Sequence, residues 1–297
     1  SRINSKRRLA VIMFGVSVFI FLIGSPFSPF ANPNFYVFIS GLRSSYVHFL
    51  NIAVSLVPND ASVLTVNNLF PHVANRLNAY VVPYSLGRLP GYIVNSNIRY
   101  VLVNAYSYIW GGQLAASYAL SHGFGLVVDA DGVYLFERGY SGAPLLTAPL
   151  HMILPASSFF FVQGSPVRVF PYSGVPGGVV YYWPSNVSGG VFWFGPYLIL
   201  MPGSYVATVY LMIDRPCNGT LLTLDVSNNA GAQVLVSRTV YCSDFPKPFV
   251  WVAFKLPFNV TSPALTIEIR GLNPTGVSGV YFGYVVLNET KVFPYDT

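Results

Sequence analysis

Four asparagines carry the pattern of N-glycosylation acceptors, N-x-Ser/Thr without proline in the middle position. All of them lie after residue 185 of the 297-residue chain: Asn186, Asn218, Asn259 and Asn288. Their clustering predicts one glycosylated module on the outer side of a membrane. The alternative is ordinary surface asparagines in turns, because the pattern is also common by chance.

The two cysteines of the chain, Cys217 and Cys242, lie in the same stretch as the four asparagines. An even pair in an oxidising compartment favours a disulfide. Metal binding would need further ligands close by in the sequence, and the sequence offers none. The bridge would close a loop of about 25 residues and contribute roughly 3 kcal/mol under the loop-entropy model.

Carbohydrate recognition needs aromatic rings that cover the apolar faces of sugars, together with a few polar groups. The candidates for stacking are Trp183, Tyr182 and Trp193, with Trp183 in the loop-like stretch VYYWPSN as the one expected to be most exposed. Core packing is the alternative for every one of them, since aromatic residues make up 16% of the chain. Further aromatics of the same region are Tyr181, Phe192 and Trp251.

The sequence predicts no catalytic residue, no metal site and no cofactor. Asp129 and Asp131 resemble a carboxylate pair, but Asp131-Gly132 between two apolar runs is typical of a tight hairpin turn. His72 and His122 are interpreted as residues at helix ends. A hydrolase is disfavoured because the sequence contains no G-x-S-x-G, H-E-x-x-H or P-loop motif, and its ten acidic residues are thinly spread.

The net charge of +6 comes mostly from the N-terminus. Arg2, Lys6, Arg7 and Arg8 precede residue 9, and the rest of the chain carries twelve basic and ten acidic residues. Nucleic-acid binding requires clustered Lys and Arg on one face. The body offers isolated charges, so we expect no nucleic-acid partner.

Residues 9–31 contain no ionisable side chain, and their length suits a helix that crosses about 30 Å of hydrocarbon. We therefore expect a transmembrane helix at 9–31, with the lipid bilayer as a partner and residues 1–8 as a basic cytoplasmic flank. The positive-inside rule then places the body outside the cytoplasm, at the cell surface. A signal peptide is the alternative, because a basic start and an apolar run describe it too.

Residues 32–152 alternate short apolar runs with helical patterns, which predicts a small, mainly parallel α/β domain. Expected helices are 44–57, 68–76 and 112–122; expected strands are 62–66, 79–83 and 99–104, followed by a hairpin over 125–139.

Residues 50–140 resemble the C-terminal part of a prokaryotic membrane-protein family, domain of unknown function 2079. The resemblance rests on VPNDASVLTVNNLFPHVANR, YVLVNA and GFGLVVDADGVYLFERG. It implies a relation to multi-spanning membrane glycosyltransferases that use lipid-linked sugars, whose catalytic groups would lie in segments this chain lacks. Pro71, His72, Asn75 and Arg76 match the family's most recognisable motif, whose role is unknown. A helix start with an arginine bonded to backbone is an equal interpretation.

Residues 153–297 predict a second, all-β domain. Eight apolar runs from residue 191 onward are separated by turn signals at the spacing of β-sandwich strands. The segments GPYLILMPGSYVATVYL and VSGVYFGYVVL are similar to jelly-roll modules that bind carbohydrate. The predicted fold class is therefore a transmembrane helix, a small α/β domain and a jelly-roll-like β-sandwich.

Two functions remain open on this basis. One is an accessory surface region of a glycosyltransferase-like membrane protein, whose sandwich binds glycans or other surface proteins. The other is a structural subunit of a cell envelope or filament that assembles through contacts between sandwiches.

Overall fold

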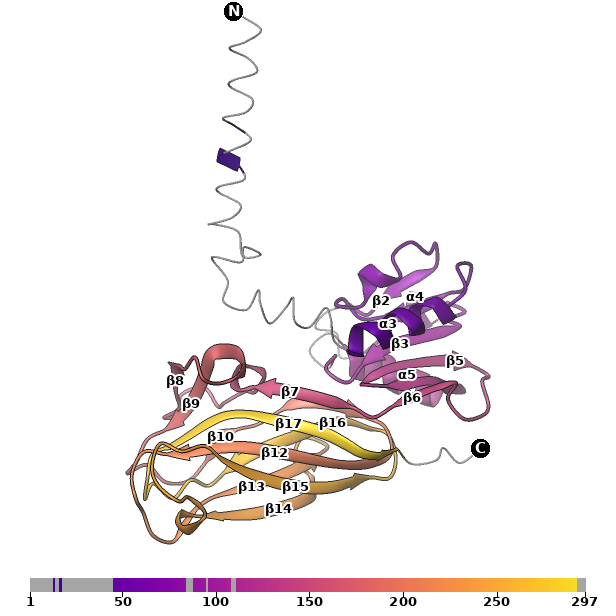
Figure 1. Cartoon of the computed structure of the whole chain (residues 1–297). Helices are drawn as coiled ribbons and strands as arrows, with labels where there is room; N and C mark the ends of the chain where they lie inside the picture. Colours follow the sequence, from indigo (N-terminus) through magenta and orange to yellow (C-terminus); the bar gives the residue numbers. More distant parts are fainter. Residues whose placement is uncertain are drawn as a thin grey trace, which may run out of the picture. The chain divides into compact units, whose positions relative to one another are not determined.

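The computed structural model describes residues 45–83, 88–94, 96–107 and 111–292, together with Met13, Val16 and Ser17. His48–Thr297 form one compact unit, and Ser1–Val47 are assigned to another. Figure 1 labels the helices and strands of the His48–Thr297 unit and the helix that leads into it.

The first part of the unit is a six-stranded mixed sheet with the strand order β2-β1-β3-β5-β4-β6. Its buried central strand β3, YVLVN, is apolar almost throughout, as a strand covered on both faces requires. The pairings β1–β2, β1–β3 and β4–β6 are parallel, and β5 is antiparallel to both of its neighbours. The elements are α3 (Ser45–Leu56), β1 (Val63–Thr65), η1 (Phe70–His72), β2 (Ala79–Val81), α4 (Gly91–Val94), β3 (Tyr100–Asn104), α5 (Gly112–Ser121), β4 (Phe124–Ala130), β5 (Val133–Arg138) and β6 (Leu146–Ala148).

The expected hairpin turn at Asp131-Gly132 is present. Both residues have positive φ, 47° and 77°, as a two-residue turn of this kind requires. Asp131 Oδ1 also accepts a hydrogen bond from the backbone N–H of His151 at 3.0 Å. The helix expected over residues 68–76 is shorter than predicted, because only the single 3-10 turn Phe70–His72 forms there.

The second part of the unit is a β-sandwich. One sheet has the order β15-β12-β17-β9-β8, with β7 also paired to β17, and the other has the order β10-β16-β13-β14, with β11 paired to β16. All eight strands expected from residue 191 onward are present, and β7, β8 and β9 are additional. The elements are β7 (His151–Pro155), η3 (Ala156–Ser158), β8 (Arg168–Pro171), η4 (Pro176–Gly178), β9 (Val179–Trp183), β10 (Val191–Trp193), β11 (Pro196–Leu200), β12 (Gly203–Ile213), β13 (Thr220–Asn228), β14 (Gln233–Tyr241), η5 (Cys242–Asp244), β15 (Val252–Val260), β16 (Ala264–Leu272) and β17 (Val280–Val292).

Aromatic packing fills the space between the two sheets. The rings of Trp193 and Phe282 stack with their centroids 4.0 Å apart. Trp193 lies directly against Gly271, where a Cβ atom would come within 2.2 Å of the indole ring. Glycine is therefore required on β16 at this point, since it leaves room for the largest side chain of the core.

One backbone and one side-chain hydrogen bond join the sandwich to the first sheet. The N–H of Ile199 on β11 donates to the carbonyl of Ala105 at 2.9 Å. The hydroxyl of Tyr134 on β5 donates to the carbonyl of Ile199 at 3.1 Å and is buried. The first sheet and the sandwich, which are joined in sequence by the β6–β7 connection, thus belong to one compact unit.

The expected fold class is wrong in its first component. The structure is mostly β-sandwich with few helices, and none of the helices in the described ranges is both long and apolar enough to cross a bilayer. The longest of them, α3, has 12 residues, or about 18 Å, whereas the hydrocarbon core measures about 30 Å. The span expected at 9–31 lies outside the described residues except for Met13, Val16 and Ser17.

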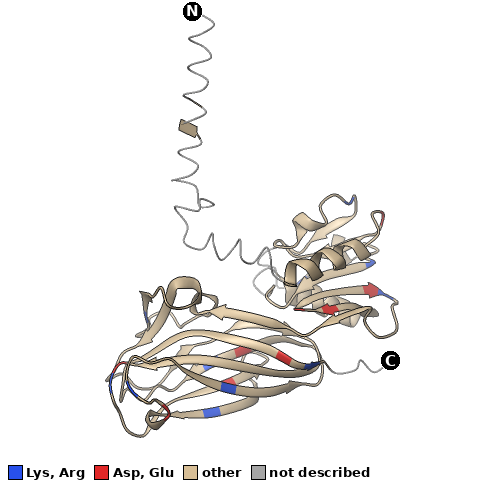
Figure 2. Cartoon of the chain, in the orientation of Figure 1, with Lys and Arg blue, Asp and Glu red and all other residues tan. Residues whose placement is uncertain are grey.

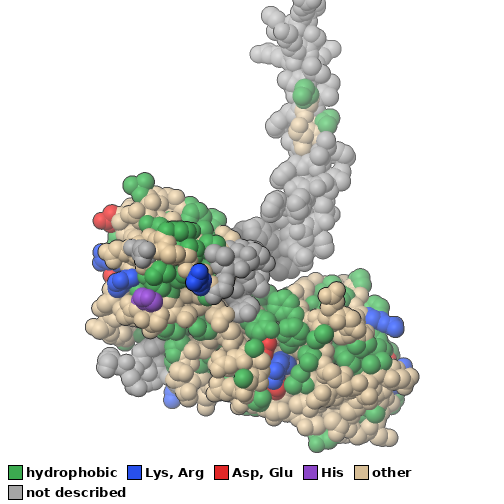
Figure 3. All heavy atoms as spheres, turned by 180° about the vertical axis from the view of Figure 1, so that it is seen from behind, with side chains coloured by type: hydrophobic (Ala, Val, Ile, Leu, Met, Phe, Trp, Pro, Cys, Tyr) green, Lys and Arg blue, Asp and Glu red, His purple; other side chains and the backbone are tan. Residues whose placement is uncertain are grey.

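Charged residues are sparse along the described chain, as the sequence predicts (Figure 2). On the face turned away from the viewer in Figure 1, hydrophobic and neutral side chains predominate (Figure 3). Because charged residues are few, the positions where they meet other polar groups are the candidates for a binding site.

Candidate functional site

A pair of half-buried tyrosines marks one end of the sandwich. Tyr182 on β9 lies directly opposite Tyr281 on β17 in the antiparallel ladder, with ring centroids 4.6 Å apart. Phe170 on the neighbouring strand β8 meets the Tyr182 ring edge-on at 5.8 Å and is 40% exposed. Because directly opposite residues share a sheet face, these rings form an aromatic surface on the outer side of the sheet.

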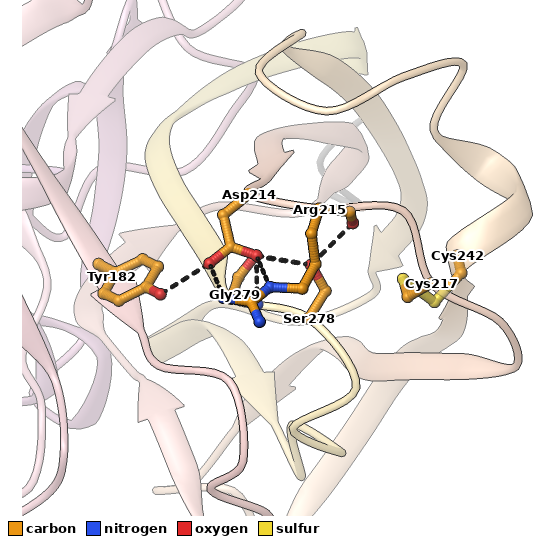
Figure 4. Close-up of polar contacts among 7 residues, drawn as sticks. All are labelled: Tyr182, Asp214, Arg215, Cys217, Cys242, Ser278 and Gly279. Atoms are coloured by element: carbon orange, nitrogen blue, oxygen red, sulfur yellow. Dashed lines mark hydrogen bonds and ion pairs between the residues drawn. A yellow bond between two sulfur atoms is a disulfide. The ribbon is translucent and has the colours of Figure 1, made fainter.

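Asp214 anchors this surface from the end of β12. Its carboxylate accepts hydrogen bonds from the hydroxyl of Tyr182 at 2.9 Å, from the backbone N–H of Gly279 at 3.0 Å and from the hydroxyl of Ser278 at 3.1 Å. Figure 4 shows these groups converging on the carboxylate from two other segments of the chain, Tyr182 from β9 and the adjacent Ser278 and Gly279 from just before β17. The close approach explains Gly279, where a Cβ atom would lie 2.3 Å from both Asp214 and Tyr182.

Arg215 completes the cluster. Its Nε and Nη2 donate to the two oxygens of Asp214 at 3.0 and 3.3 Å, while its side chain stays 55% exposed. The arrangement holds the guanidinium in a fixed place at the surface and leaves Nη1 outside this bidentate pairing. Arg215 is therefore a positioned hydrogen-bond donor beside the Tyr182 ring.

The titration properties of the cluster follow from these contacts. Burial acts to raise the pKa of Asp214, but the donors Arg215, Tyr182, Gly279 and Ser278 outweigh it and hold that pKa below its ordinary value. Burial, followed by the hydrogen bond to Asp214, raises the pKa of Tyr182 to about 12. At neutral pH the site therefore holds an ionised carboxylate, a protonated phenol and a guanidinium.

The expected disulfide between Cys217 and Cys242 is confirmed, with a Cα–Cα distance of 5.4 Å. It fastens the β12–β13 loop to the end of β14, and the backbone N–H of Cys242 also donates to the carbonyl of Gly219 at 2.9 Å. Arg215 lies two residues before Cys217 in this loop (Figure 4). The disulfide thus stabilises the segment that presents the guanidinium.

The three residues proposed for sugar stacking have different positions. Tyr182 is half-exposed at the site described above. Trp183 is only 2% exposed and donates from Nε1 to the carbonyl of Val187 at 2.8 Å, so the expectation that it is the most exposed ring is wrong. Trp193 is fully buried against Phe282. Alternation along β9 accounts for the difference, because Trp183 and Tyr182 face opposite sides of the sheet.

The four predicted acceptor asparagines all lie in the sandwich. Asn186, Asn218 and Asn259 are exposed. Asn288 is half-buried on β17, and its Oδ1 lies 2.5 Å from Nδ1 of His151. Glycosylation of these residues stays a prediction, with Asn288 the acceptor whose amide group is already engaged.

The family motif lies in the first part of the unit, on and just after η1. Pro71, His72 and Asn75 are exposed. Arg76 is 8% exposed, and its Nη2 donates to the carbonyls of Val54 and Val57 at 2.9 and 2.8 Å. Both carbonyls lie at the C-terminal end of α3, where the last carbonyls lack the i+4 donors of the helix interior, and that of Val54 also accepts from the N–H of Val57 at 3.3 Å. The geometry gives Arg76 a structural role as a cap of α3.

Three members of the site, Asp214, Arg215 and Tyr281, were not singled out from the sequence. A usable signal existed, because Asp214-Arg215 is an adjacent pair of opposite charges directly after a strand in a region with few charges. Among the described residues, no group of three or more His, Cys, Asp or Glu side chains is arranged to hold a metal ion. What the cluster offers is a ring face with a fixed donor beside it.

Comparison with known families confirms the resemblance of the N-terminal half. The family "Predicted membrane protein (DUF2079)" matches residues 3–134. The match includes the motif around Arg76 and ends within β5, before the sandwich begins. No curated protein matches the chain.

Solved carbohydrate-binding modules are among the structures to which this chain is similar. The C-terminal CBM6 of a laminarinase from Zobellia galactanivorans is 16% identical, with a TM-score of 0.34, and covers 47% of this chain and 99% of its own. A module of Cellvibrio mixtus lichenase 5A in complex with cellotriose is 14% identical, with a TM-score of 0.33, covering 47% and 97%. At TM-scores this low, the likenesses do not decide the function of this chain.

Proposed function

We propose that the sandwich is an extracytoplasmic glycan-binding region of a membrane-associated protein, and that it accompanies a glycosyltransferase-like activity located elsewhere. The observation that carries the proposal is the half-exposed Tyr182–Tyr281 pair with Arg215 held beside it by Asp214. A sugar ring offers an apolar face to an aromatic ring and hydroxyl groups to a fixed donor.

Three further features support the location and the membrane association. The Cys217–Cys242 disulfide is typical of oxidising compartments outside the cytoplasm. Residues 3–134 match a family of predicted membrane proteins. The exposed asparagines Asn186, Asn218 and Asn259 suit the same compartment.

The test is glycan-array binding by the purified full chain. We expect binding to at least one class of oligosaccharide, and Tyr182→Ala should weaken it by about tenfold or more, equivalent to about 1.4 kcal/mol. The matched control is Tyr92→Ala, which removes an exposed tyrosine of α4 far along the chain from the sandwich. Absence of any glycan binding, or equal loss in both variants, would refute the proposal.

A structural surface subunit is the second candidate, and one observation favours it. Strand β14 is at the edge of its sheet, runs for nine residues and exposes Val234 at 52%. Open edges of this kind pair with strands of other chains. Electron microscopy of purified membranes should show ordered arrays under this hypothesis, and isolated particles would count against it.

A further inference from the structure

Two exposed arginines lie on either side of the Tyr182 ring. Arg215 and the hydroxyl of Tyr182 both donate hydrogen bonds to the carboxylate of Asp214. Arg168 on β8 lies directly opposite Tyr182 in the ladder between β8 and β9, so the two side chains leave the same face of the sheet. The aromatic surface is therefore flanked by two cations that come from different strands.

The single carboxylate of this site does not offset both arginines. Asp214 accepts from Tyr182, Ser278 and Gly279 as well as from Arg215, so its oxygens are already engaged within the protein. One exposed positive charge remains in excess when Asp214 and Arg215 are counted as a neutral pair. This excess positive charge lies beside the Tyr182 ring, where it can pair with an anionic ligand that rests on the ring.

The rest of this sheet face has the same sign. Lys255 on β15 is exposed and lies opposite Thr208 of β12, and Thr208 lies opposite Val286 of β17. Glu289 at the far end of β17 is buried, and its Oε2 accepts from the N–H of Leu150. The acids of the other sheet, Asp225 and Glu268, are buried next to Arg270. Exposed charges on the aromatic face are thus basic, in a surface that is otherwise poor in charge (Figure 2).

We propose that this face binds acidic glycans, whose sugar rings lie on Tyr182 and Tyr281 and whose carboxylates pair with Arg215 and Arg168. The inference rests on the proposed glycan-binding function and adds the class of ligand. A guanidinium held in place by Asp214 suits a carboxylate because it presents its remaining donors without first losing side-chain freedom. Neutral sugars use the rings and one donor but leave the second arginine without a partner.

The test compares two ligands that share one sugar backbone and differ at the carboxyl group, which is ionised in one and esterified in the other. Oligogalacturonate and its methyl ester, matched in length, are titrated against the full chain at low and at 0.5 M salt. We expect the acid to bind at least tenfold more tightly at low salt, and the advantage to shrink at high salt because exposed ion pairs are screened. The methyl ester should bind weakly and with little dependence on salt.

Variants assign the effect to the two arginines. Arg215→Gln and Arg168→Gln should each reduce the preference for the acid severalfold, and Arg215→Lys should retain part of it. The control is Arg99→Gln, which removes an equally exposed arginine of the first sheet that pairs with Glu137. Circular dichroism of each variant shows whether the sandwich remains folded.

The outcomes separate the two proposals. Equal affinity for the acid and the ester overturns the acidic-ligand inference and leaves glycan binding in place. Binding of neither overturns the acidic-ligand inference, and absence of binding on the glycan array as well overturns the glycan-binding function. If a poly(dT) strand of matched charge binds as tightly, with the same dependence on Arg215, the site selects anions and not acidic sugars, and the inference is refuted.

Discussion

Asp214 is the residue on which the site depends most, because it connects β9, β12 and the start of β17 through one carboxylate. Three of its four donors, Tyr182, Ser278 and Gly279, come from other parts of the chain, and the fourth is the exposed Arg215. The positions of Tyr182 and Arg215 therefore both depend on Asp214. Its lowered pKa means that the folded state favours the ionised form. The corresponding stability is present above the ordinary pKa of an aspartate and is lost as the pH falls through the lower, folded-state value.

We predict that Asp214→Asn destabilises the protein by about 2 kcal/mol at pH 7, the size expected for loss of hydrogen bonds to a charged group. The difference from wild type should shrink on acidification towards pH 2, because uptake of a proton by the wild-type carboxylate removes the negative charge that the asparagine lacks at every pH. Urea denaturation at both pH values measures this. A difference that stays constant over the range would show that the charge of Asp214 does not contribute.

Arg76 belongs to a sequence motif of unknown role, but its contacts indicate that it stabilises the end of α3. Removing its donors in Arg76→Met takes away the side-chain donor of the Val57 carbonyl and one of the two donors of the Val54 carbonyl, at the end of α3. We expect a loss of about 2 kcal/mol in the free energy of unfolding. His72→Ala, an exposed change in the same motif, should alter stability by less than about 0.5 kcal/mol; equal effects would contradict the capping role.

At the scale of elements, the disulfide connects stability with the site. The bridge spans 25 residues and restrains the β12–β13 loop that begins with Asp214 and Arg215. We predict that the double variant Cys217→Ser/Cys242→Ser loses roughly 3 kcal/mol of stability, as the loop-entropy model expects. It should also bind glycan more weakly than wild type under conditions where both are folded.

Chemical denaturation with and without a reducing agent provides the first measurement, and titration of the folded protein provides the second. Reduction of the wild type should reproduce the double variant. Unchanged glycan affinity after reduction would mean that the sheet alone positions Arg215, without help from the bridge.

At the scale of the whole molecule, the shortage of charge predicts tolerance of acid. Among the described residues, the carboxylates of Asp214 and Glu289 have pKa values shifted in opposite directions. Asp214 loses its stabilising contribution on acidification. Burial raises the pKa of Glu289, so its contribution is greatest below the ordinary glutamate pKa and is lost as the pH rises through the folded-state value.

We therefore expect only a small net loss of stability between pH 7 and pH 2. Thermal unfolding followed by circular dichroism across this range measures it, and a steep fall would contradict the prediction.

In Glu289→Gln the stability should exceed that of wild type at pH 7 and equal it at pH 3. The glutamine keeps an acceptor for the N–H of Leu150 while removing the buried charge.

The sequence by itself determined the strands of the sandwich, the hairpin at Asp131-Gly132 and the pairing of the only two cysteines. These depend on local patterns, since alternation, turn residues and a single pair of thiols leave few choices. It also revealed the resemblance to the membrane-protein family over the first part of the chain.

Only the tertiary structure decided which aromatic rings face solvent. Tyr182 and Trp183 are neighbours in an entirely apolar run, and the side of β9 that meets the core is set by its pairing with β17. The same pairing brings Tyr281 to Tyr182, and the ends of β12 and β17 bring Asp214 to Gly279. Contacts between residues 32 to 99 positions apart leave no local trace in the sequence, because they arise when separate strands align in one sheet.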